Sequence, residues 1–542
     1  MEFADLIKTP KVDEVLLQRP LEPKVVGTLC LTGHHLIFSS RQDNSEELWL
    51  LHRNVDVLEK RFIGTVGTLT LKCKDLRIIH FDIQGMEECL NVAASVEVLS
   101  TLNTSLMYPF FHRPMFEAIK EDWQLYNPSE EIKRLSSLGW RLSDINKDYS
   151  LCPTYPAVIM VPDTIEDDVL QKSAAFRQLG RFPVLSYCHH NGVALLRCGQ
   201  PLIGTVMRRC KEDERLVNAA LGTSGKRGYI LDTRSPQVAQ QAKTRGGGFE
   251  PDAHYPQWRR IHRSIERPQG LQESFMKLLE ACNDTSAGVD RWLSRLDACN
   301  WLGHIKDVLT TACVAAQCLD REGTVVLVHG NEGTDSTLQV TALAQLILQP
   351  EGRGLRGFLT LLEREWLQAG HPFQERCARS AYSTKTRQQA PSFLLFLDCC
   401  HQLLLQFPCS FEFSEELLIC LFEHSYASQF GTFLGSNEQE RKQLKLQHKT
   451  VSLWSWINQP TVQPQYLNPL YEPNSHVIWP SVAPQSLHFW EGAFLRWCRS
   501  AEESERARDE TRRLANKHSQ LQARVWALRE QLAELERNDP GP

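Results

Sequence analysis

A turn between residues 324 and 337 carries residue types that proteins use to hold phosphate. Its sequence, TVVLVHGNEGTDST, passes from a β-branched apolar run into a turn with two glycines and two acids, and then into the polar start of a helical pattern. In such a strand–turn–helix unit the backbone N–H groups and the helix dipole favour a negative charge. The segment therefore predicts a phosphate-binding loop. Whether that loop is catalytic depends on the side chains it carries.

Two other interpretations of this turn are weaker. A nucleotide-binding loop of the form GxxxxGK[ST] needs a lysine and a spacing that are both missing. A metal site from His329, Glu332 and Asp335 would require side chains three and six residues apart in a tight turn to converge on one ion. We therefore expect no metal and no cofactor.

Composition places the chain among ordinary globular proteins. Its 542 residues, of which 42% are hydrophobic and 23% charged, suffice for two or more domains. The formal net charge of -5 argues against a nucleic-acid partner. Seventeen cysteines without a secretory signal indicate reduced cytosolic thiols. The most apolar run, residues 393–407, is interrupted by Asp398 and His401 and predicts a buried helix.

The first hundred or so residues alternate in the manner of short strands. Residues 25–40 predict two strands around a turn at Gly33 and His34, and residues 67–73 and 77–83 predict two more. Residues 85–99 then place apolar side chains at helical spacing, as expected for a helix that closes one end of a small barrel.

These segments carry a family resemblance. GTLCLTGHHLIF, LWLLHRNVDVLEK and the closing helix resemble the pleckstrin-homology-type GRAM module of the myotubularin-related phosphatases. Further along, alternating helical and strand-like segments indicate an α/β domain. Blocks such as LDTRSPQVAQQAKTRGGGFE, NWLGHIKDVL and NPLYEPNSHVIWP resemble the myotubularin phosphatase domain, in family order, nearly to Ser500.

The resemblance implies an α+β multidomain chain. We expect a PH/GRAM-like β-barrel over residues 1–104 and a linker over 105–122. An α/β domain of the Cys-dependent phosphatase (myotubularin) type is expected over residues 123–500, and a C-terminal α-helical coiled coil over 505–537.

For the turn at residues 329–336, the resemblance implies a phosphate-binding loop that lacks the reactive groups of the active members. Active members carry His-Cys-Ser-Asp-Gly-Trp-Asp-Arg, in which the cysteine attacks phosphorus and the arginine grips its oxygens. Here Gly330 takes the nucleophile position and Ser336 the arginine position, while Asp335 matches the proposed general acid. An acid protonates a leaving group only after attack, so we expect a phosphatase fold that does not cleave. The degenerate turn comprises His329, Gly330, Asn331, Glu332, Gly333, Thr334, Asp335 and Ser336.

Basic residues are candidates for contact with lipid headgroups, because the GRAM module of this family contributes to phosphoinositide membrane binding. Arg245 lies in the RGGGFE turn, which resembles a block near the family's substrate cleft. The alternatives are solvated loop charges in the first domain and structural turn glycines in the second. The candidates are Lys24, Lys60, Arg61, Lys72, Lys74, Arg77 and Arg245.

The C-terminal tail repeats leucine every seven residues. Leu514, Leu521, Leu528 and Leu535 take the d positions of a heptad, and Val525 and Leu532 take a positions. Such a narrow seam is typical of a two-stranded coiled coil, although a single helix folded back on the preceding domain is the alternative.

These features predict a catalytically inactive member of the family that acts as an adaptor or regulatory subunit. The resemblance implies pairing through the tail with an active myotubularin-related phosphoinositide 3-phosphatase, whose stability, activity or membrane targeting would increase. A homodimer is also possible. We expect a cytoplasmic protein, peripherally associated with endosomal or other intracellular membranes. The alternative is a phosphoinositide sensor or scaffold that uses the GRAM-like module and the non-hydrolysing cleft.

Overall fold

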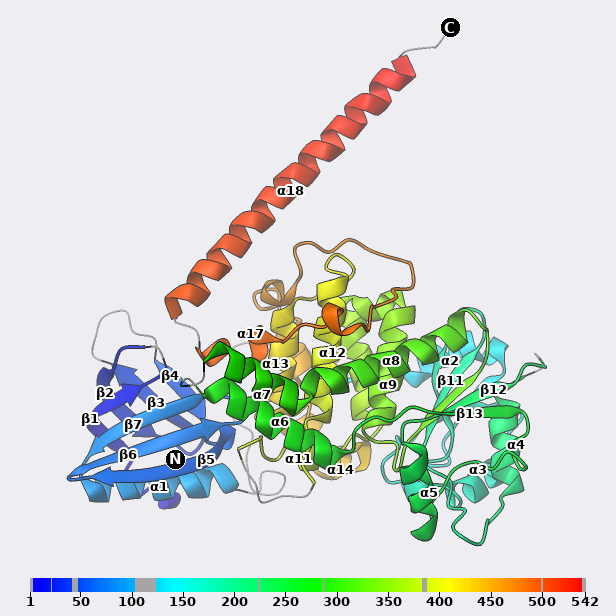
Figure 1. Cartoon of the computed structure of the whole chain (residues 1–542), viewed down its shortest axis with the longest axis horizontal. Helices are drawn as coiled ribbons and strands as arrows, with labels where there is room; N and C mark the ends of the chain where they lie inside the picture. The colour runs from blue at the N-terminus through cyan, green and yellow to red at the C-terminus, as the bar shows by residue number, and fades with distance from the viewer. Residues whose placement is uncertain are drawn as a thin grey trace.

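The computed structural model describes residues 3–20, 22–40, 47–102, 123–222, 225–284, 286, 288–382, 388–498 and 501–538. These residues form a β-rich domain, a larger α/β domain and a long C-terminal helix (Figure 1). The linker predicted over residues 105–122 lies outside the described residues.

The first domain is a seven-stranded sheet in the order β4-β3-β2-β1-β7-β6-β5, with every neighbouring pair antiparallel. Alternating residues such as Leu69 and Phe81 are buried in a core shared with helix α1 (Met86–Thr101). The order leaves β4 and β5 as edges, so the PH/GRAM-like β-barrel expected from sequence is a half-barrel. The strands are β1 (Lys11–Gln18), β2 (Val25–Leu31), β3 (His35–Ser40), β4 (Leu48–Leu51), β5 (Val55–Ile63), β6 (Val66–Cys73) and β7 (Ile78–Gln84).

The second domain is built on a five-stranded sheet in the order β10-β11-β14-β12-β13. β10 is antiparallel to β11, and the other pairs are parallel. β14 is therefore central, and its carboxyl end lies between those of β11 and β12, where open α/β sheets bind ligands. A separate antiparallel pair joins β8 and β9. The strands are β8 (Trp140–Ser143), β9 (Ile159–Pro162), β10 (Val184–Cys188), β11 (Ala194–Cys198), β12 (Gly228–Asp232), β13 (Trp258–His262) and β14 (Val326–His329).

Helices pack around this sheet, and a larger group of helices lies beside it (Figure 1). The apolar run at residues 393–407 is a buried helix, α12, as predicted. Its Asp398 accepts hydrogen bonds from Trp301 Nε1 at 2.8 Å and Gln402 Nε2 at 2.9 Å, which explains how a carboxyl is tolerated there. The helices are α2 (Pro128–Leu135), α3 (Asp167–Ala174), α4 (Lys211–Ala219), α5 (Pro236–Thr244), α6 (Pro268–Asn283), α7 (Val289–Cys299), α8 (Trp301–Asp320), α9 (Ser336–Leu348), α10 (Leu355–Leu362), α11 (Phe373–Arg376), α12 (Ser392–Gln406), α13 (Glu415–Tyr426), α14 (Glu438–Gln443), α15 (Leu446–Lys449), α16 (Leu453–Ile457) and α17 (Glu491–Phe494).

Buried polar groups join the two domains. The Asp56 carboxylate of β5 accepts hydrogen bonds from the backbone N–H of Ser380 at 2.9 Å and from its hydroxyl at 2.5 Å. The Asp75 carbonyl accepts hydrogen bonds from Arg496 at 2.7 Å and from Trp497 Nε1 at 2.8 Å. Asp56 and Asp75 are both buried, so these contacts fix the first domain against the second.

The tail is one helix, α18 (Ala501–Asn538), which projects away from both domains (Figure 1). Midway along α18, Gln522 Nε2 donates a hydrogen bond to Glu472 Oε1 of the second domain, at 2.9 Å. Folding back, the alternative to a coiled coil, would bury the seam, and the structure keeps it exposed. Among the described helices, none combines the length and the apolar character needed to cross a bilayer.

Candidate functional site

The predicted strand–turn–helix unit lies at the centre of the second sheet. β14 ends at His329, residues 330–335 form the turn, and α9 begins at Ser336. The sheet register pairs His329 with Cys198 of β11 and with Asp232 of β12. Residues that follow those two strands therefore border the turn, although they are distant in sequence.

Gly333 sets the shape of the turn. Its φ of +78° lies in the left-handed region, and a Cβ placed on it would come within 2.3 Å of the Cys198 carbonyl oxygen. The backbone of β11 cannot move aside, because it is hydrogen-bonded to β14. Only glycine fits this position.

Replacing Gly333 by alanine is expected to destabilise the chain by at least about 3 kcal/mol, which combines the left-handed φ with a backbone clash. Gly192→Ala is the matched control, because Gly192 has a φ of +82° but open space around its Cβ. It should cost only about 1–2 kcal/mol. Chemical denaturation of both variants measures the difference, and equal losses would show that the approach to Cys198 does not matter.

A side chain at the nucleophile position could not be added unless its neighbours moved. A Cβ on Gly330 would lie 2.6 Å from Thr233 Oγ1 and 3.3 Å from Ser336 Oγ. These two hydroxyls are hydrogen-bonded to each other at 2.8 Å, and Thr233 is buried. A pair of neutral hydroxyls therefore occupies the space beside the position where the family resemblance places the attacking sulfur.

Asp335, at the position of the proposed general acid, is a partner of Arg376. The guanidinium donates two hydrogen bonds to the carboxylate, at 2.9 and 2.8 Å, and the Ser392 hydroxyl donates a third at 2.9 Å. Burial acts to raise the pKa of Asp335, but Arg376 outweighs it and holds the pKa well below its usual range. At neutral pH this carboxylate has no proton to donate.

His329 belongs to a buried chain of charges behind the turn. Its Nε2 lies 2.9 Å from Glu250 Oε2, and the other oxygen of Glu250 accepts a 2.6 Å hydrogen bond from Arg177. Arg177 also pairs with Asp213 at 2.6 Å. Burial would raise the pKa of Glu250, but His329 and Arg177 hold it well below its usual range. Two of the three residues considered for a metal therefore have separate partners, since His329 pairs with Glu250 and Asp335 with Arg376.

Two further arginines border the turn, and both are committed to protein acceptors. Arg234 forms a two-point pair with Asp232 and donates to Gln200 Oε1 at 2.6 Å and to Asn331 Oδ1 at 3.2 Å. Arg181 donates to the Gly333 carbonyl at 2.9 Å. These guanidinium groups support the turn, so a phosphate would have to compete with existing partners for them.

The exposed rim of the turn is formed by Asn331 and Glu332, whereas Thr334 is buried. Arg245 is exposed at the carboxyl end of α5, where its backbone N–H donates to the Ala242 carbonyl at 3.0 Å. The structure therefore leaves the Arg245 side chain accessible, and lipid contact there stays a prediction.

The six candidate lipid residues of the first domain fall into two groups. Lys24 pairs with Asp82 at 3.9 Å and Lys60 with Glu97 at 2.9 Å, both at exposed positions, and Arg61 is also exposed. A second group, Lys72, Lys74 and Arg77, faces the second domain: the Lys72 ammonium lies 5.9 Å from the Tyr382 ring centre, Lys74 is buried, and Arg77 stacks on Trp497 at 4.4 Å. Lipid binding stays a prediction for all six residues, and those of the second group also lie where the two domains meet.

Along α18, the predicted seam residues are exposed. The exposed fraction of the side chains is 46% for Val525 and between 53% and 57% for Leu514, Leu521, Leu528 and Leu532. The side chain of Leu535 lies outside those that the structure describes. Exposed leucine repeated at heptad spacing is unfavourable in water. Pairing of this seam with a second helix stays a prediction.

Sequence reasoning missed the residues that fill and brace the turn. Thr233 lies in the LDTRSP block, but only the pairing of β12 with β14 brings it to Gly330. Arg376 is 41 residues from Asp335, and no local pattern links the two. Glu250 ends the RGGGFE turn, where its charge gave no sign of burial against His329.

The half-barrel, the parallel sheet and the turn after its central strand define a Cys-dependent-phosphatase-like chain with an N-terminal GRAM-type module. Residues 107–442 match the myotubularin-like phosphatase domain, and residues 11–100 match the GRAM domain of MTMR6–9. The first match spans more than half of the chain, so the chain belongs to the myotubularin-related family.

Full-length relatives agree with this assignment. The chain is 63% identical to myotubularin-related protein 9 of Homo sapiens over 544 residues, which cover 99% of each chain. It is 40% identical to myotubularin-related protein 9 of Caenorhabditis elegans over 563 residues, 99% of each chain. It is 36% identical to the human phosphatidylinositol-3,5-bisphosphate 3-phosphatase MTMR6 over 509 residues, which cover 91% of this chain and 81% of that protein.

Proposed function

We propose that this chain is a catalytically inactive myotubularin-related protein that serves as the regulatory subunit of an active relative. The observation that carries the proposal is the space beside Gly330, which is filled by the hydrogen-bonded hydroxyls of Thr233 and Ser336. Cysteine-dependent phosphoryl transfer needs a thiolate there and a guanidinium for the equatorial oxygens. Gly330 supplies no thiolate and Ser336 supplies no guanidinium. Asp335 is ionised and has no proton to donate.

The effects of these losses on the rate are not additive, but each loss alone is large. Removing one member of a catalytic unit typically costs several orders of magnitude in rate, and little activity remains for a second loss to remove. The hydroxyls of Thr233 and Ser336 bind each other instead of presenting a nucleophile to a phosphate. We therefore expect no measurable turnover of a 3-phosphoinositide.

The tail supports the adaptor role. Its exposed seam has the spacing of a two-stranded coiled coil and needs a second helix to bury it. Relatives named phosphatidylinositol-3,5-bisphosphate 3-phosphatases are 36% identical to this chain over 91% of its length, so we propose them as the partner class. The seam contains nothing that forbids a homodimer, which would compete.

Membrane association is proposed for the GRAM-type domain. Exposed Lys24, Lys60 and Arg61 supply positive charge, and pairing two such domains in one complex would make a weak lipid contact avid. The complex would then be cytoplasmic and peripheral to endosomal or other intracellular membranes.

The alternative function is a phosphoinositide sensor or scaffold. The turn geometry favoured by Gly333 and the start of α9 still offer backbone N–H groups to an anion. Against tight binding, Arg181 and Arg234 already have protein partners. Lipid binding that depends on Arg245, and not on the first domain, would favour this function.

The test is hydrolysis of phosphatidylinositol 3-phosphate by the purified chain, by an active relative of the 3-phosphatase class, and by their mixture. The chain alone should be inactive, and it should raise the activity or the thermal stability of the relative. A chain lacking residues 505–542 is the control, and it should have no effect on the relative. Activity in the chain alone would contradict the proposal, and no effect in any mixture would leave the sensor alternative.

A further inference from the structure

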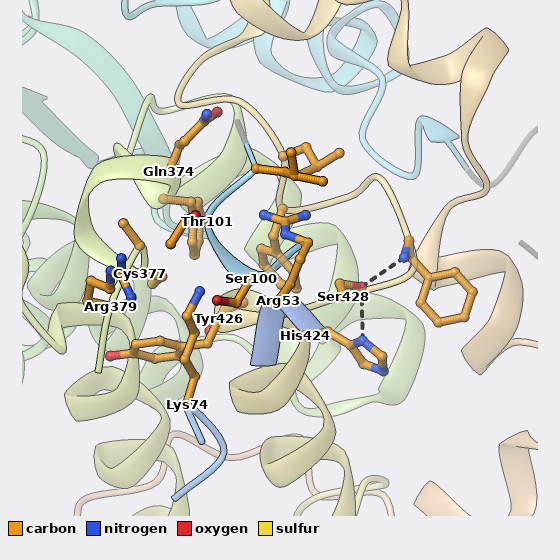
Figure 2. Close-up of a pocket in the computed structure, with 17 residues that line it drawn as sticks. Arg53, Lys74, Ser100, Thr101, Gln374, Cys377, Arg379, His424, Tyr426 and Ser428 are labelled. Atoms are coloured by element: carbon orange, nitrogen blue, oxygen red, sulfur yellow. Dashed lines mark hydrogen bonds between the residues drawn. The ribbon is translucent and has the colours of Figure 1, made fainter. Parts of the chain in front are cut away.

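A cavity of about 220 Å³ lies between the GRAM-type domain and the phosphatase-like domain (Figure 2). The first domain contributes Arg53, Lys74 and the end of α1 at Ser100 and Thr101. The second domain contributes the segment that contains Arg379 and the end of α13. The cavity therefore exists only when the two domains are in contact.

Its charge is positive. Arg53, Lys74 and Arg379 line it, and none of its described lining residues is acidic. Burial lowers the pKa of the lining His424 to about 4, so this imidazole is neutral at pH 7. Arg379 is held from behind by Asp56, because it donates to the Asp56 carbonyl at 2.8 Å and pairs with the Asp56 carboxylate at 3.6 Å. That carboxylate is a negative charge near the cavity, and it acts to raise the pKa of Lys74.

Lys74 distinguishes this cavity from an ordinary basic patch. Its side chain is only 6% exposed, and Figure 2 shows it extending into the cavity. Among the described residues, no carboxylate lies within 4.0 Å of its ammonium, and no hydrogen-bond acceptor is assigned to it. Burial and the neighbouring Arg53 lower the pKa of Lys74 to about 7. An unpaired buried ammonium is costly, so proteins usually supply it with an anion.

We propose that this cavity binds a phosphomonoester dianion that bridges the two domains. A dianion would neutralise Lys74 and take charge-assisted hydrogen bonds from the arginines. Tyr426 and Ser428 also line the cavity (Figure 2). They offer hydroxyl groups for the polyol part of an inositol phosphate, although the Ser428 hydroxyl already has a hydrogen bond with His424 Nδ1 at 2.9 Å. The volume admits a small phosphorylated polyol, which excludes a long phosphopeptide. Because both domains contribute, the ligand would stabilise their closed arrangement.

The chemistry is shared by soluble inositol phosphates, lipid headgroups and inorganic phosphate. Three probes separate these sources with the full chain: inorganic phosphate, inositol 1,3-bisphosphate, and phosphatidylcholine vesicles with and without phosphatidylinositol 3-phosphate. Calorimetry measures the soluble probes, and flotation measures the vesicles. Saturable binding of a soluble probe would assign the site to free phosphates, and binding of phosphoinositide vesicles alone would assign it to a lipid headgroup.

Lys74→Met decides whether the binding belongs to this cavity. We expect it to weaken binding at least tenfold, the loss of about one charge-assisted hydrogen bond. The thermal stability of the unliganded chain should be equal or higher, because an unpaired buried charge is removed. Lys11→Met, at an exposed position of the same domain that has no proposed role in lipid binding, is the control and should bind normally.

Two results would overturn the proposal. One is no binding of any of the three probes. The other is binding that persists in Lys74→Met but disappears in Arg234→Gln, because the anion would then lie in the turn at Gly330. If Lys74→Met does not fold, Arg53→Gln takes its place with the same expected loss of binding.

Discussion

Replacing Gly330 by cysteine and Ser336 by arginine together is expected to leave hydrolysis of phosphatidylinositol 3-phosphate at background. Adding Thr233→Ala should raise it at least about tenfold. In the double variant the new Cβ would lie 2.6 Å from Thr233 Oγ1, closer than real Cβ contacts. The threonine or the turn must then shift, and the sulfur loses the alignment that in-line attack requires.

The triple variant removes this obstacle but not every defect. Alanine at position 233 clears the space beside the sulfur, while the arginine regains a position on the phosphate oxygens. Asp335 remains paired with Arg376 and ionised, so leaving-group protonation is still missing. We therefore expect the triple variant to stay about 10²-fold below an active relative, the usual size of a general-acid contribution.

Phosphate release is the primary measurement, and the pH dependence of alkylation reports whether the new thiol forms a thiolate. The single variant Gly330→Cys is the control and should alkylate slowly without turnover. Equal activity of the double and triple variants would show that Thr233 does not obstruct the site. Turnover by the unmodified chain would overturn the inactive assignment itself.

Replacing Leu521 and Leu528 by lysine is expected to abolish association of the chain through α18. Both are d positions of the seam, and they are 53% and 55% exposed in the single chain. Each buried leucine lost from a packed interface costs about 2–5 kcal/mol. Two losses, with lysine charge added, should weaken pairing by at least about 10³-fold.

The control is a pair of lysines on the outer face of the same helix, Ala523→Lys and Ala527→Lys. It adds the same charge and keeps the helix, but both positions lie outside the a and d seam. Light scattering and co-purification with an active relative measure association, and circular dichroism checks that the helix remains. Association that survives the leucine changes would contradict the coiled coil and point to contacts between the globular domains.

Local patterns in the sequence determined much of the architecture. The alternation of apolar and polar residues around Leu69 and Leu71 predicted a strand, which the structure has as β6. The apolar run before His329 predicted a second strand, which is β14. The spacing of Leu514, Leu521 and Leu528 predicted a helix with one apolar seam, which α18 has. These patterns are readable because strand and helix periods depend on residues only a few positions apart.

Whether the sheet of the first domain closes into a barrel could not be predicted from such local patterns. The strand segments indicated a barrel, whereas the pairing order leaves β4 and β5 at open edges. Whether edge strands meet depends on the twist and register of all seven strands, which no single segment contains.

The sequence by itself also determined what the turn lacks, because no fold supplies a thiol at Gly330 or a guanidinium from Ser336. Only the tertiary structure decided what occupies the space instead. Pairing of β12 with β14 brings Thr233 to the turn, and helix packing brings Arg376 to Asp335. Contact between two domains buries Lys74 with no carboxylate of the described residues within 4.0 Å of its ammonium. The missing groups follow from residue types alone, whereas these contacts depend on register and packing between distant segments.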